Sequence, residues 1–372
     1  MRYHDLVVSR DGSRLYAAAG DSLQLISLPE GKVIATYVCE KQTDKASNQT
    51  PAPTHFHTLT VSRDDKYVVA VTNESKAVHV FNSKDLSLIS RRPFPKRPSA
   101  IDSTKDALVV GDKFGDVYAV PITSMDSVIK EEGDASIEPI LGHVSMLVDV
   151  KMGEFNGREY VITADRDEHI RVTRYPQSYV IERWLFGHEE FVSSVEVLPW
   201  GDKNLLVSGG GDDSVFLWDW TTGELKDKFD LRPVISEHLN DDHKPPKKKG
   251  ASEPEDRYEI TVSRVIAIPD LHQVVVQCEG TNALIQLKIT DKLEFVSKLV
   301  LDHKIIGVTA SQDSALVVSL DPAQGDSDLL LRLTANDNGL QIESSINVDT
   351  STIKGEQAAL YTTKQLRKRG EH

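Results

Sequence analysis

The sequence predicts an all-β fold that repeats one four-stranded unit, and two observations carry that prediction. Residues 142–172 align on residues 187–217 without a gap, at a spacing of 45. Each copy also has a Gly-His start, a Ser/Thr-x-x-x-Asp turn and an apolar strand, and the second copy continues into Trp218-Asp219. These features are typical of a WD40 blade. Seven blades of about 45 residues would fill most of the 372 residues, so the expected fold is a seven-bladed WD40 β-propeller.

Weaker copies of the unit precede and follow the aligned pair. Ser9-Arg10-Asp11 and Ser62-Arg63-Asp64 each precede a hairpin, and the alternation in Val78 to Phe81 indicates a half-buried strand. Asp302-His303 opens the last unit where Gly-His stood earlier. One propeller is expected to span residues 1–350. Its predicted blades are approximately residues 1–40, 55–92, 96–125, 138–182, 183–230, 259–298 and 299–348.

Two polar stretches and the C-terminal residues fall outside the repeat. Residues 236–258 are rich in Pro, Lys, Asp and Glu, and residues 41–54 are similarly polar. Such stretches bury too little apolar surface to order themselves, so both are expected to be flexible insertions. A basic-ended tail, residues 351–372, is expected to contain a short helix over 356–369. The residues from Tyr3 to Val8 are expected to close the ring by adding a strand to the last blade.

Composition limits the function. The chain carries 43 Lys and Arg against 57 Asp and Glu, a formal net charge of −14. An autonomous nucleic-acid-binding protein needs a basic face, so any work on RNA is expected to go through a partner. Two cysteines are too few for a disulfide framework or a zinc site. With no secretory signal and no membrane-length apolar run, a soluble intracellular protein is expected.

The histidines of the two aligned copies predict buried hydrogen-bond networks. In WD40 blades such a network joins the Gly-His histidine, the turn Asp, a strand Ser or Thr and the strand Trp. The expected members are His188, Asp212, Ser208 and Trp218 in the fifth blade, and His143, Asp167 and Thr163 in the fourth, where Thr173 replaces the Trp. A Ser-His-Asp catalytic triad is the alternative. The repeat explains every member structurally, so the network is preferred.

No motif predicts a catalytic, cofactor-binding or metal-binding residue. The run Gly209-Gly210-Gly211 could suggest a phosphate-binding loop, but neither the dinucleotide fingerprint nor a P-loop is present. These glycines occupy a strand-to-turn position, which favours a structural role. The sequence also lacks a His-Glu-x-x-His motif and a Cys-x-x-Cys motif. The chain is therefore expected not to be an enzyme.

One rim of the predicted propeller is a candidate docking surface. The turn Asp165 to His169 of the fourth blade and Glu189-Glu190-Phe191 of the fifth should be neighbours there. With Asp167 in the network, the residues expected to face solvent around Phe191 are Asp165, Arg166, Glu168, Glu189 and Glu190. A mostly acidic patch with an aromatic residue suits a basic partner. An ordinary solvated rim is the alternative.

Two basic runs suggest nuclear import. Lys244 to Lys249 reads Lys-Pro-Pro-Lys-Lys-Lys, and a less clear run spans Lys364 to Arg369. Plain solvated charge is the alternative for both. The expected location is the nucleus.

Several segments resemble one family, the WD-repeat non-catalytic subunit of the tRNA (guanine-N7-)-methyltransferase. The resemblance is strongest in the third to fifth blades, and the polar insertion and basic tail look like fungal members. The similar segments are Lys96 to Ile101, Gly111 to Tyr118, Leu141 to Leu147, Ile162 to Val172, Tyr175-Pro176 and Phe186 to His188. The Asp-Arg-Asp-Glu-x-Ile-Arg run is far more specific than Gly-His or Trp-Asp.

The resemblance implies a heterodimer. Its other subunit would bind S-adenosylmethionine and form 7-methylguanosine at position 46, in the variable loop of tRNA. The propeller would hold that subunit in an active conformation and meet tRNA mainly through it, with no cofactor, membrane or small-molecule substrate of its own. The family docks its partner near the fourth and fifth blades, which implies that the rim is an interface. His169 and Arg171 then join that interface, although Arg171 could instead brace the turn.

One residue departs from the family pattern. Members can carry Lys after Gly-His, whereas Glu189 stands here, so a partner that pairs with it must differ in charge. Two other functions are alternatives. The chain could be a generic WD40 adaptor, such as a ubiquitin-ligase substrate receptor or a chromatin scaffold. A propeller enzyme is the third reading, which the missing catalytic motifs disfavour.

Overall fold

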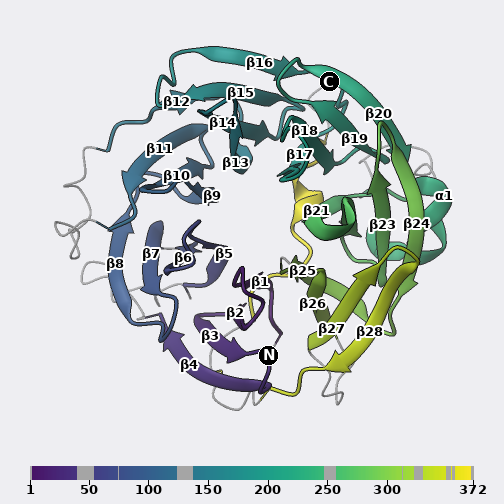
Figure 1. Cartoon of the computed structure of the whole chain (residues 1–372), viewed down its shortest axis with the longest axis horizontal. Coiled ribbons are helices and arrows are strands. Elements are labelled where there is room, and N and C mark those ends of the chain that lie inside the picture. Colours follow the sequence, from purple (N-terminus) through teal and green to yellow (C-terminus); the bar gives the residue numbers. More distant parts are fainter. Residues whose placement is uncertain are drawn as a thin grey trace.

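The computed structural model is a ring of seven four-stranded antiparallel sheets, which confirms the predicted propeller (Figure 1). Each sheet is one blade, and its first strand lies nearest the centre of the ring. The structure describes residues 2–39, 54–73, 75–123, 137–246, 257–311, 313–321, 330–348, 353 and 357–369. In these residues no helix is long and apolar enough to cross a membrane.

The blades follow one another along the chain. The strands of the first three blades are β1 (Asp5–Val8), β2 (Arg14–Ala19), β3 (Ser22–Ser27), β4 (Lys32–Val38), β5 (Phe56–Val61), β6 (Tyr67–Thr72), β7 (Ala77–Asn82), β8 (Leu88–Pro93), β9 (Pro98–Ser103), β10 (Ala107–Asp112), β11 (Asp116–Pro121) and β12 (Leu141–Gly142). Those of the fourth and fifth are β13 (Leu147–Phe155), β14 (Arg158–Asp165), β15 (Ile170–Tyr175), β16 (Ile181–Leu185), β17 (Val192–Val197), β18 (Leu205–Gly210), β19 (Ser214–Asp219) and β20 (Glu224–Asp230). Those of the sixth and seventh are β21 (Val262–Ile268), β22 (Gln273–Cys278), β23 (Ala283–Ile289), β24 (Leu293–Val300), β25 (Lys304–Ala310), β26 (Ala315–Asp321), β27 (Leu330–Asn336) and β28 (Gly339–Ser345).

Burial along the strands reflects their place in a blade. All six residues of β22 are buried, because neighbouring blades cover both faces of a middle strand. The outermost strand β4 alternates exposed and half-buried residues, since only one of its faces packs inward. The core is consequently a series of apolar layers between adjacent blades, rich in Val, Leu and Ile.

Two blade edges differ from the sequence-based boundaries. The short strand β12 pairs with β11, so Leu141-Gly142 completes the third blade although it was expected in the fourth. The fourth blade ends with β16, which extends beyond the expected end at residue 182. The Gly-His pair thus lies between two blades, and its histidine forms hydrogen bonds within the blade that follows.

The expected ring closure was wrong. The strand Asp5–Val8 pairs with β2 of its own blade, and each sheet consists of four consecutive strands. Side chains close the ring instead: the Val8 N–H donates to Thr309 Oγ1 at 3.3 Å, and Arg264 Nη2 lies 2.7 Å from Asp5 Oδ1. Tyr3 and Leu6 also pack with Val317 and Leu330 of the last blade.

Similar bonds join successive inner strands elsewhere in the ring. In each, a side-chain oxygen of one inner strand accepts a backbone N–H from the next blade. The pairs are Asp5 with Leu59, Asp102 with Met152, Asp149 with Val195, and Ser194 with Val265, at 2.7, 2.7, 2.8 and 3.0 Å. The closing bond from Val8 to Thr309 has the same form, so the seam resembles the other blade junctions.

The insertion after the fifth blade is partly ordered, contrary to expectation. It follows the short helix α1 (Arg232–Ile235) and contains the 3-10 turns η1 (Ser236–His238) and η2 (Asp241–His243). Leu239 packs into the core between the fifth and sixth blades, and His243 Nε2 lies 2.9 Å from the Glu279 carbonyl oxygen. These contacts supply the burial that composition did not predict. Residues 247–256, and 41–53 of the other insertion, lie outside the described residues.

The expected C-terminal helix is also absent from the described residues. Within 357–369, only Thr363–Leu366 forms a regular turn, the 3-10 turn η4. The fold contains one further 3-10 turn, η3 (Pro269–Leu271). The residues 357–369, hereafter the C-terminal segment, return across the ring toward β17 and β21, in yellow in Figure 1.

A buried histidine makes stability depend on pH. His79 is 1% exposed, packs between Tyr37, Phe56 and Phe81, and neither ring nitrogen has a hydrogen-bond partner. Burial lowers its pKa from 6.5 to about 3. The unfolded chain therefore takes up this proton first, and stability should fall by about 1.4 kcal/mol per pH unit from pH 6.5 down to about 3.

Denaturant titrations at pH 7 and pH 5 test this expectation. The variant His79→Phe keeps a ring among the aromatic neighbours but cannot take up a proton. Its free energy of unfolding should therefore fall less between pH 7 and pH 5 than that of the wild type. Equal losses for the two proteins would contradict the assignment. The surface variant His272→Phe is the matched control and should behave as the wild type.

Candidate partner-binding rim

The fifth blade contains the expected four-residue network. Trp218 Nε1–H donates to Ser208 Oγ at 2.8 Å, and Ser208 Oγ lies 2.7 Å from His188 Nε2. His188 Nδ1 lies 2.7 Å from Asp212 Oδ2, which completes the chain. Ser208 and Trp218 are fully buried. A substrate could not reach this hydroxyl, so the arrangement is a structural network and does not resemble a working Ser-His-Asp triad.

In the fourth blade, Asp165 takes the place expected for Asp167. His143 lies 2.7 Å from Thr163 Oγ1 and 3.0 Å from Asp165 Oδ2. Asp165 Oδ1 also accepts the backbone N–H groups of Asp167 and His169. The ungapped alignment misled here because Gly210, at the position of Asp165, has no side chain, and Asp212 must reach back from two residues later. Asp165 is 3% exposed and does not face solvent as expected.

Hydrogen bonding outweighs burial in the ionisation of Asp165. Burial alone would raise the pKa of this carboxyl, but the bonds from His143 and the backbone N–H of His169 lower it overall. The turn is therefore organised around an ionised carboxylate. Burial also disfavours the charged form of His143, and it therefore lowers the pKa of this imidazole.

Two of the three glycines, Gly210 and Gly211, allow close packing against the loop that precedes β17, and Gly209 packs against Val262 of β21. A Cβ on Gly210 would lie 1.8 Å from the Phe191 carbonyl oxygen, and one on Gly211 would lie 2.7 Å from the Phe191 ring. No side chain fits in either place. Their structural role therefore accounts for the run, as the sequence favoured, and none of them opens a helix that could hold a phosphate.

The C-terminal segment covers much of the predicted interface. Arg166 Nε donates to the Leu366 carbonyl oxygen at 2.7 Å, and Asp167 Oδ1 pairs with Lys368 at 2.8 Å. Glu190 Oε1 pairs with Arg367 at 2.7 Å. Of the acidic residues predicted to face a basic partner, Glu190 is thus already paired within the chain, and so is Asp167, which was expected in the network.

Phe191 and Arg171 are buried rather than presented at the surface. Phe191 is 2% exposed, with the Arg367 guanidinium 5.7 Å from its ring centre. Arg171 is 6% exposed, donates to the Gly142 carbonyl oxygen at 2.9 Å and lies over the Trp184 ring. Of its two possible roles, this geometry favours bracing the blade. Burial lowers the pKa of Arg171, although its charge is retained at neutral pH.

A group of aromatic rings lies next to the acidic turn, and two of its members, the half-buried Trp184 and the exposed Phe186, were not predicted. We call His169, Trp184 and Phe186 the aromatic patch. Trp184 and Phe186 stack with ring centres 6.0 Å apart, and His169 packs edge-on against both. Phe186 is 67% exposed. The only sequence signal was a Trp and a Phe just before Gly187-His188, where a surface loop was expected.

The aromatic patch has an acidic border. Glu168 shares the turn with His169, and Glu189 follows Gly187-His188; both carboxylates are exposed. Exposed stacked aromatic rings beside charge are a typical composition for a binding hot spot. Of the predicted interface, the structure therefore leaves Glu168, His169 and Glu189 available, and it adds Trp184 and Phe186.

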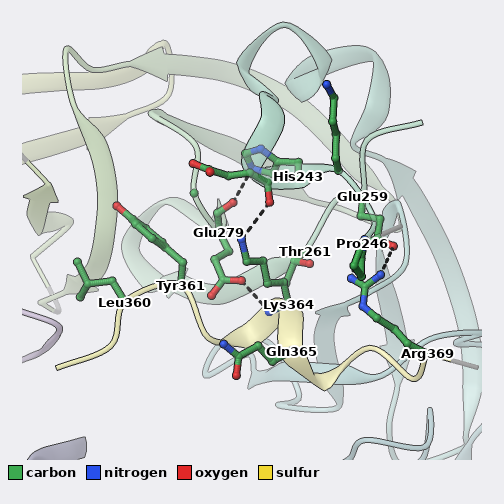
Figure 2. Close-up of a pocket in the computed structure, with 13 residues that line it drawn as sticks. His243, Pro246, Glu259, Thr261, Glu279, Leu360, Tyr361, Lys364, Gln365 and Arg369 are labelled. Atoms are coloured by element: carbon green, nitrogen blue, oxygen red, sulfur yellow. Dashed lines mark hydrogen bonds and ion pairs between the residues drawn. The ribbon is translucent and has the colours of Figure 1, made fainter. Parts of the chain in front are cut away.

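A cavity of about 490 Å³ lies between the C-terminal segment and the ordered insertion (Figure 2). Its wall includes His243, Glu259, Glu279, Tyr361 and Lys364. The labelled charged groups bond mainly to one another: Arg369 to Glu259, and the Lys364 backbone to Glu279. In the described residues no three His, Cys, Asp or Glu side chains gather as metal ligands. The cavity marks a seam between packed segments.

Comparison with known proteins identifies the family. The family model described as "tRNA methyltransferase TRM82 WD40 domain" matches residues 27–138 and 124–342. Proteins named tRNA (guanine-N(7)-)-methyltransferase non-catalytic subunit TRM82 are 39% identical in Kluyveromyces lactis, 35% in Debaryomyces hansenii and 34% in Saccharomyces cerevisiae. Each match covers 87% of this chain and 76–78% of the relative.

Solved structures support the fold alone. The U3-55K structure has a TM-score of 0.66 at 17% identity and covers 92% of this chain and 95% of its own. The RRP9 WD40 repeats have a TM-score of 0.64 at 17% identity and cover 88% and 90%.

The fold, with hydrogen-bond networks buried in its blades and aromatic rings on one rim, places the chain in the class of WD40 propellers. The sequence match narrows that class. The chain belongs to the TRM82 family, the WD-repeat non-catalytic subunits of tRNA (guanine-N7-)-methyltransferase. This membership confirms the resemblance and the expected accessory role.

Proposed function

We propose that this protein is the non-catalytic subunit of a tRNA (guanine-N7-)-methyltransferase heterodimer and stabilises the catalytic subunit in its active conformation. The observation that carries the proposal is the family match, which spans most of the propeller. It favours this function over a generic WD40 adaptor. The methyl donor, S-adenosylmethionine, would be held by the catalytic subunit, and the product would be 7-methylguanosine at position 46 of tRNA.

The aromatic patch is the proposed contact for the catalytic subunit. Its exposed Phe186 ring and half-buried Trp184 ring offer apolar area that would be buried on docking, and Glu168 and Glu189 at its edge would favour a basic partner surface. The net charge of −14 disfavours strong binding of tRNA by this subunit alone, so tRNA would be met mainly through the catalytic subunit.

Nuclear location is proposed from the run Lys244 to Lys249. Support for the second basic run is weaker, because Arg367 and Lys368 are held in ion pairs on the rim. Of the first run, Lys247 to Lys249 lie outside the described residues.

Loss of the gene should abolish 7-methylguanosine in tRNA, because the catalytic subunit would lack its stabilising partner. Mass spectrometry of nucleosides from purified tRNA measures this, and re-expression of the chain should restore the modified base. Other methylated nucleosides in the same samples are the control. Unchanged 7-methylguanosine in the deletion strain would overturn the proposed function.

Purification of the native complex separates this proposal from the adaptor alternative. Recovery of an S-adenosylmethionine-dependent methyltransferase in a 1:1 complex is expected. Recovery of ubiquitin-ligase or chromatin components without a methyltransferase would favour the alternative.

A further inference from the structure

The C-terminal segment follows one rim of the ring across four blades. It binds residues at or just after the second strand of each blade, in reverse order along the chain. The contacts are Tyr361 with Asp321 of the seventh blade, Thr363 and Lys364 with Glu279 of the sixth, Arg367 with Gly211 of the fifth and Lys368 with Asp167 of the fourth. Because the segment contacts four successive blades at equivalent positions, it binds the rim along a specific path.

Arg367 occupies a well-defined binding site in the middle of that path. Its side chain is only 12% exposed. The Nη1 atom pairs with Glu190, while Nη2 donates to the Gly211 and Ile260 carbonyl oxygens at 2.6 and 3.1 Å. The guanidinium lies over the Phe191 ring. Carboxylate, carbonyl oxygens and an aromatic face together match what a planar guanidinium can bind.

A second anchor is the buried carboxylate of Glu279. This residue is 5% exposed, and its two oxygens accept the backbone N–H groups of Thr363 and Lys364, each at 2.7 Å. Figure 2 shows Glu279 and Lys364 side by side where the segment forms its turn. A buried carboxylate without such donors would be costly, so the rim is complete only with the segment in place.

The far end of the segment holds the turn that borders the aromatic patch. The Leu366 carbonyl oxygen accepts from Arg166 Nε at 2.7 Å, and Lys368 Nζ pairs with Asp167 at 2.8 Å. Both partners belong to the turn that presents Glu168 and His169. Because Arg367 lies between these two contacts, its site fixes the position of both.

We propose that the C-terminal segment is an intramolecular ligand of the rim, and that its binding through Arg367 positions the fourth-blade turn for docking of the catalytic subunit. The docking part of this inference rests on the proposed function. In it, Arg367 is a positioning residue that does not itself contact the partner, and the segment remains bound in the complex.

Full-length Arg367→Ala tests the intramolecular part by hydrogen exchange. Losing Arg367 should release the segment, so the amides of residues 363–368 and of the turn 166–169 should exchange at least about tenfold faster, as expected for loss of charge-assisted hydrogen bonds. The matched control is Arg369→Ala, which removes a more exposed pair with Glu259 in the same segment and should leave the turn unchanged. Unchanged exchange in Arg367→Ala would overturn the proposal.

Affinity for the purified catalytic subunit tests the docking part. By calorimetry, Arg367→Ala should bind about tenfold more weakly, with wild-type melting of the propeller core, and Arg369→Ala should bind as the wild type. Equal or tighter binding by Arg367→Ala would overturn the positioning role; tighter binding would mean that the segment competes with the partner. Absence of binding by the wild type would overturn the proposed function, and the exchange result would still decide the intramolecular part.

Discussion

Replacing Trp218 by Ala should lower the free energy of unfolding by about 3–5 kcal/mol, because it empties a fully buried site next to Phe216 and His188. The loss has two parts. One is the cavity left by the indole ring, and the other is the hydrogen bond from Nε1 to Ser208. Equilibrium denaturation in urea, followed by circular dichroism, measures the change.

Two further variants separate these parts. Trp218→Phe keeps most of the apolar ring but removes the bond to Ser208, so its cost should be smaller than that of the Ala variant. Trp200→Ala is the matched control: that ring stacks on His272 and is only partly buried, so its loss should cost less than that of Trp218. A midpoint for Trp218→Ala equal to that of the wild type would contradict the structural role of the network.

Replacing Phe186 by Ala should weaken binding of the catalytic subunit by about 2 kcal/mol, or roughly 30-fold, as for an aromatic residue at the centre of an interface. Stability should change by no more than about 0.5 kcal/mol, because the ring is 67% exposed in the free protein. Surface plasmon resonance against the purified catalytic subunit measures the affinity, and thermal melting measures the stability.

The control for this prediction is another exposed phenylalanine. Phe295 is 50% exposed on β24 of the sixth blade and stacks on Phe229, as Phe186 stacks on Trp184. Phe295→Ala should bind the catalytic subunit as the wild type does. If both variants bound normally, the aromatic patch would not be the interface. If both bound weakly, the effect would not be specific to the patch.

The sequence predicted the propeller because each sequence repeat corresponds to one four-stranded blade. Each blade needs the same alternation of strands and turns, and the Gly-His histidine and the strand Ser or Thr recur 45 residues apart, as His143 with His188 and Thr163 with Ser208. The substitution of Asp165 for Asp167 could not be predicted from the alignment. It depends on the turn geometry of one blade, where a side chain at the strand end reaches the histidine directly.

The rim was harder to predict because its contacts join residues far apart in the chain. Arg367 meets Glu190, and Leu366 meets Arg166 some 200 residues earlier, so no local pattern signals either contact. Blade topology and the sequence of the rim loops indicated a free carboxylate at Glu190, which the folded chain pairs with Arg367. The exposure of Phe186 was equally hidden, since sequence cannot tell a ring that packs inward from one that stacks on a neighbour at the surface.

The ring closes at the junction between the first and last blades. Within the described residues, the first and last blades share no ladder of backbone bonds, as at the other blade junctions, and are joined by side-chain bonds and apolar packing such as those of Val8, Thr309 and Tyr3. Separating these two blades therefore breaks no sheet. Local opening at this junction would leave each four-stranded sheet intact and would expose the apolar residues that pack there, such as Leu6 and Val317.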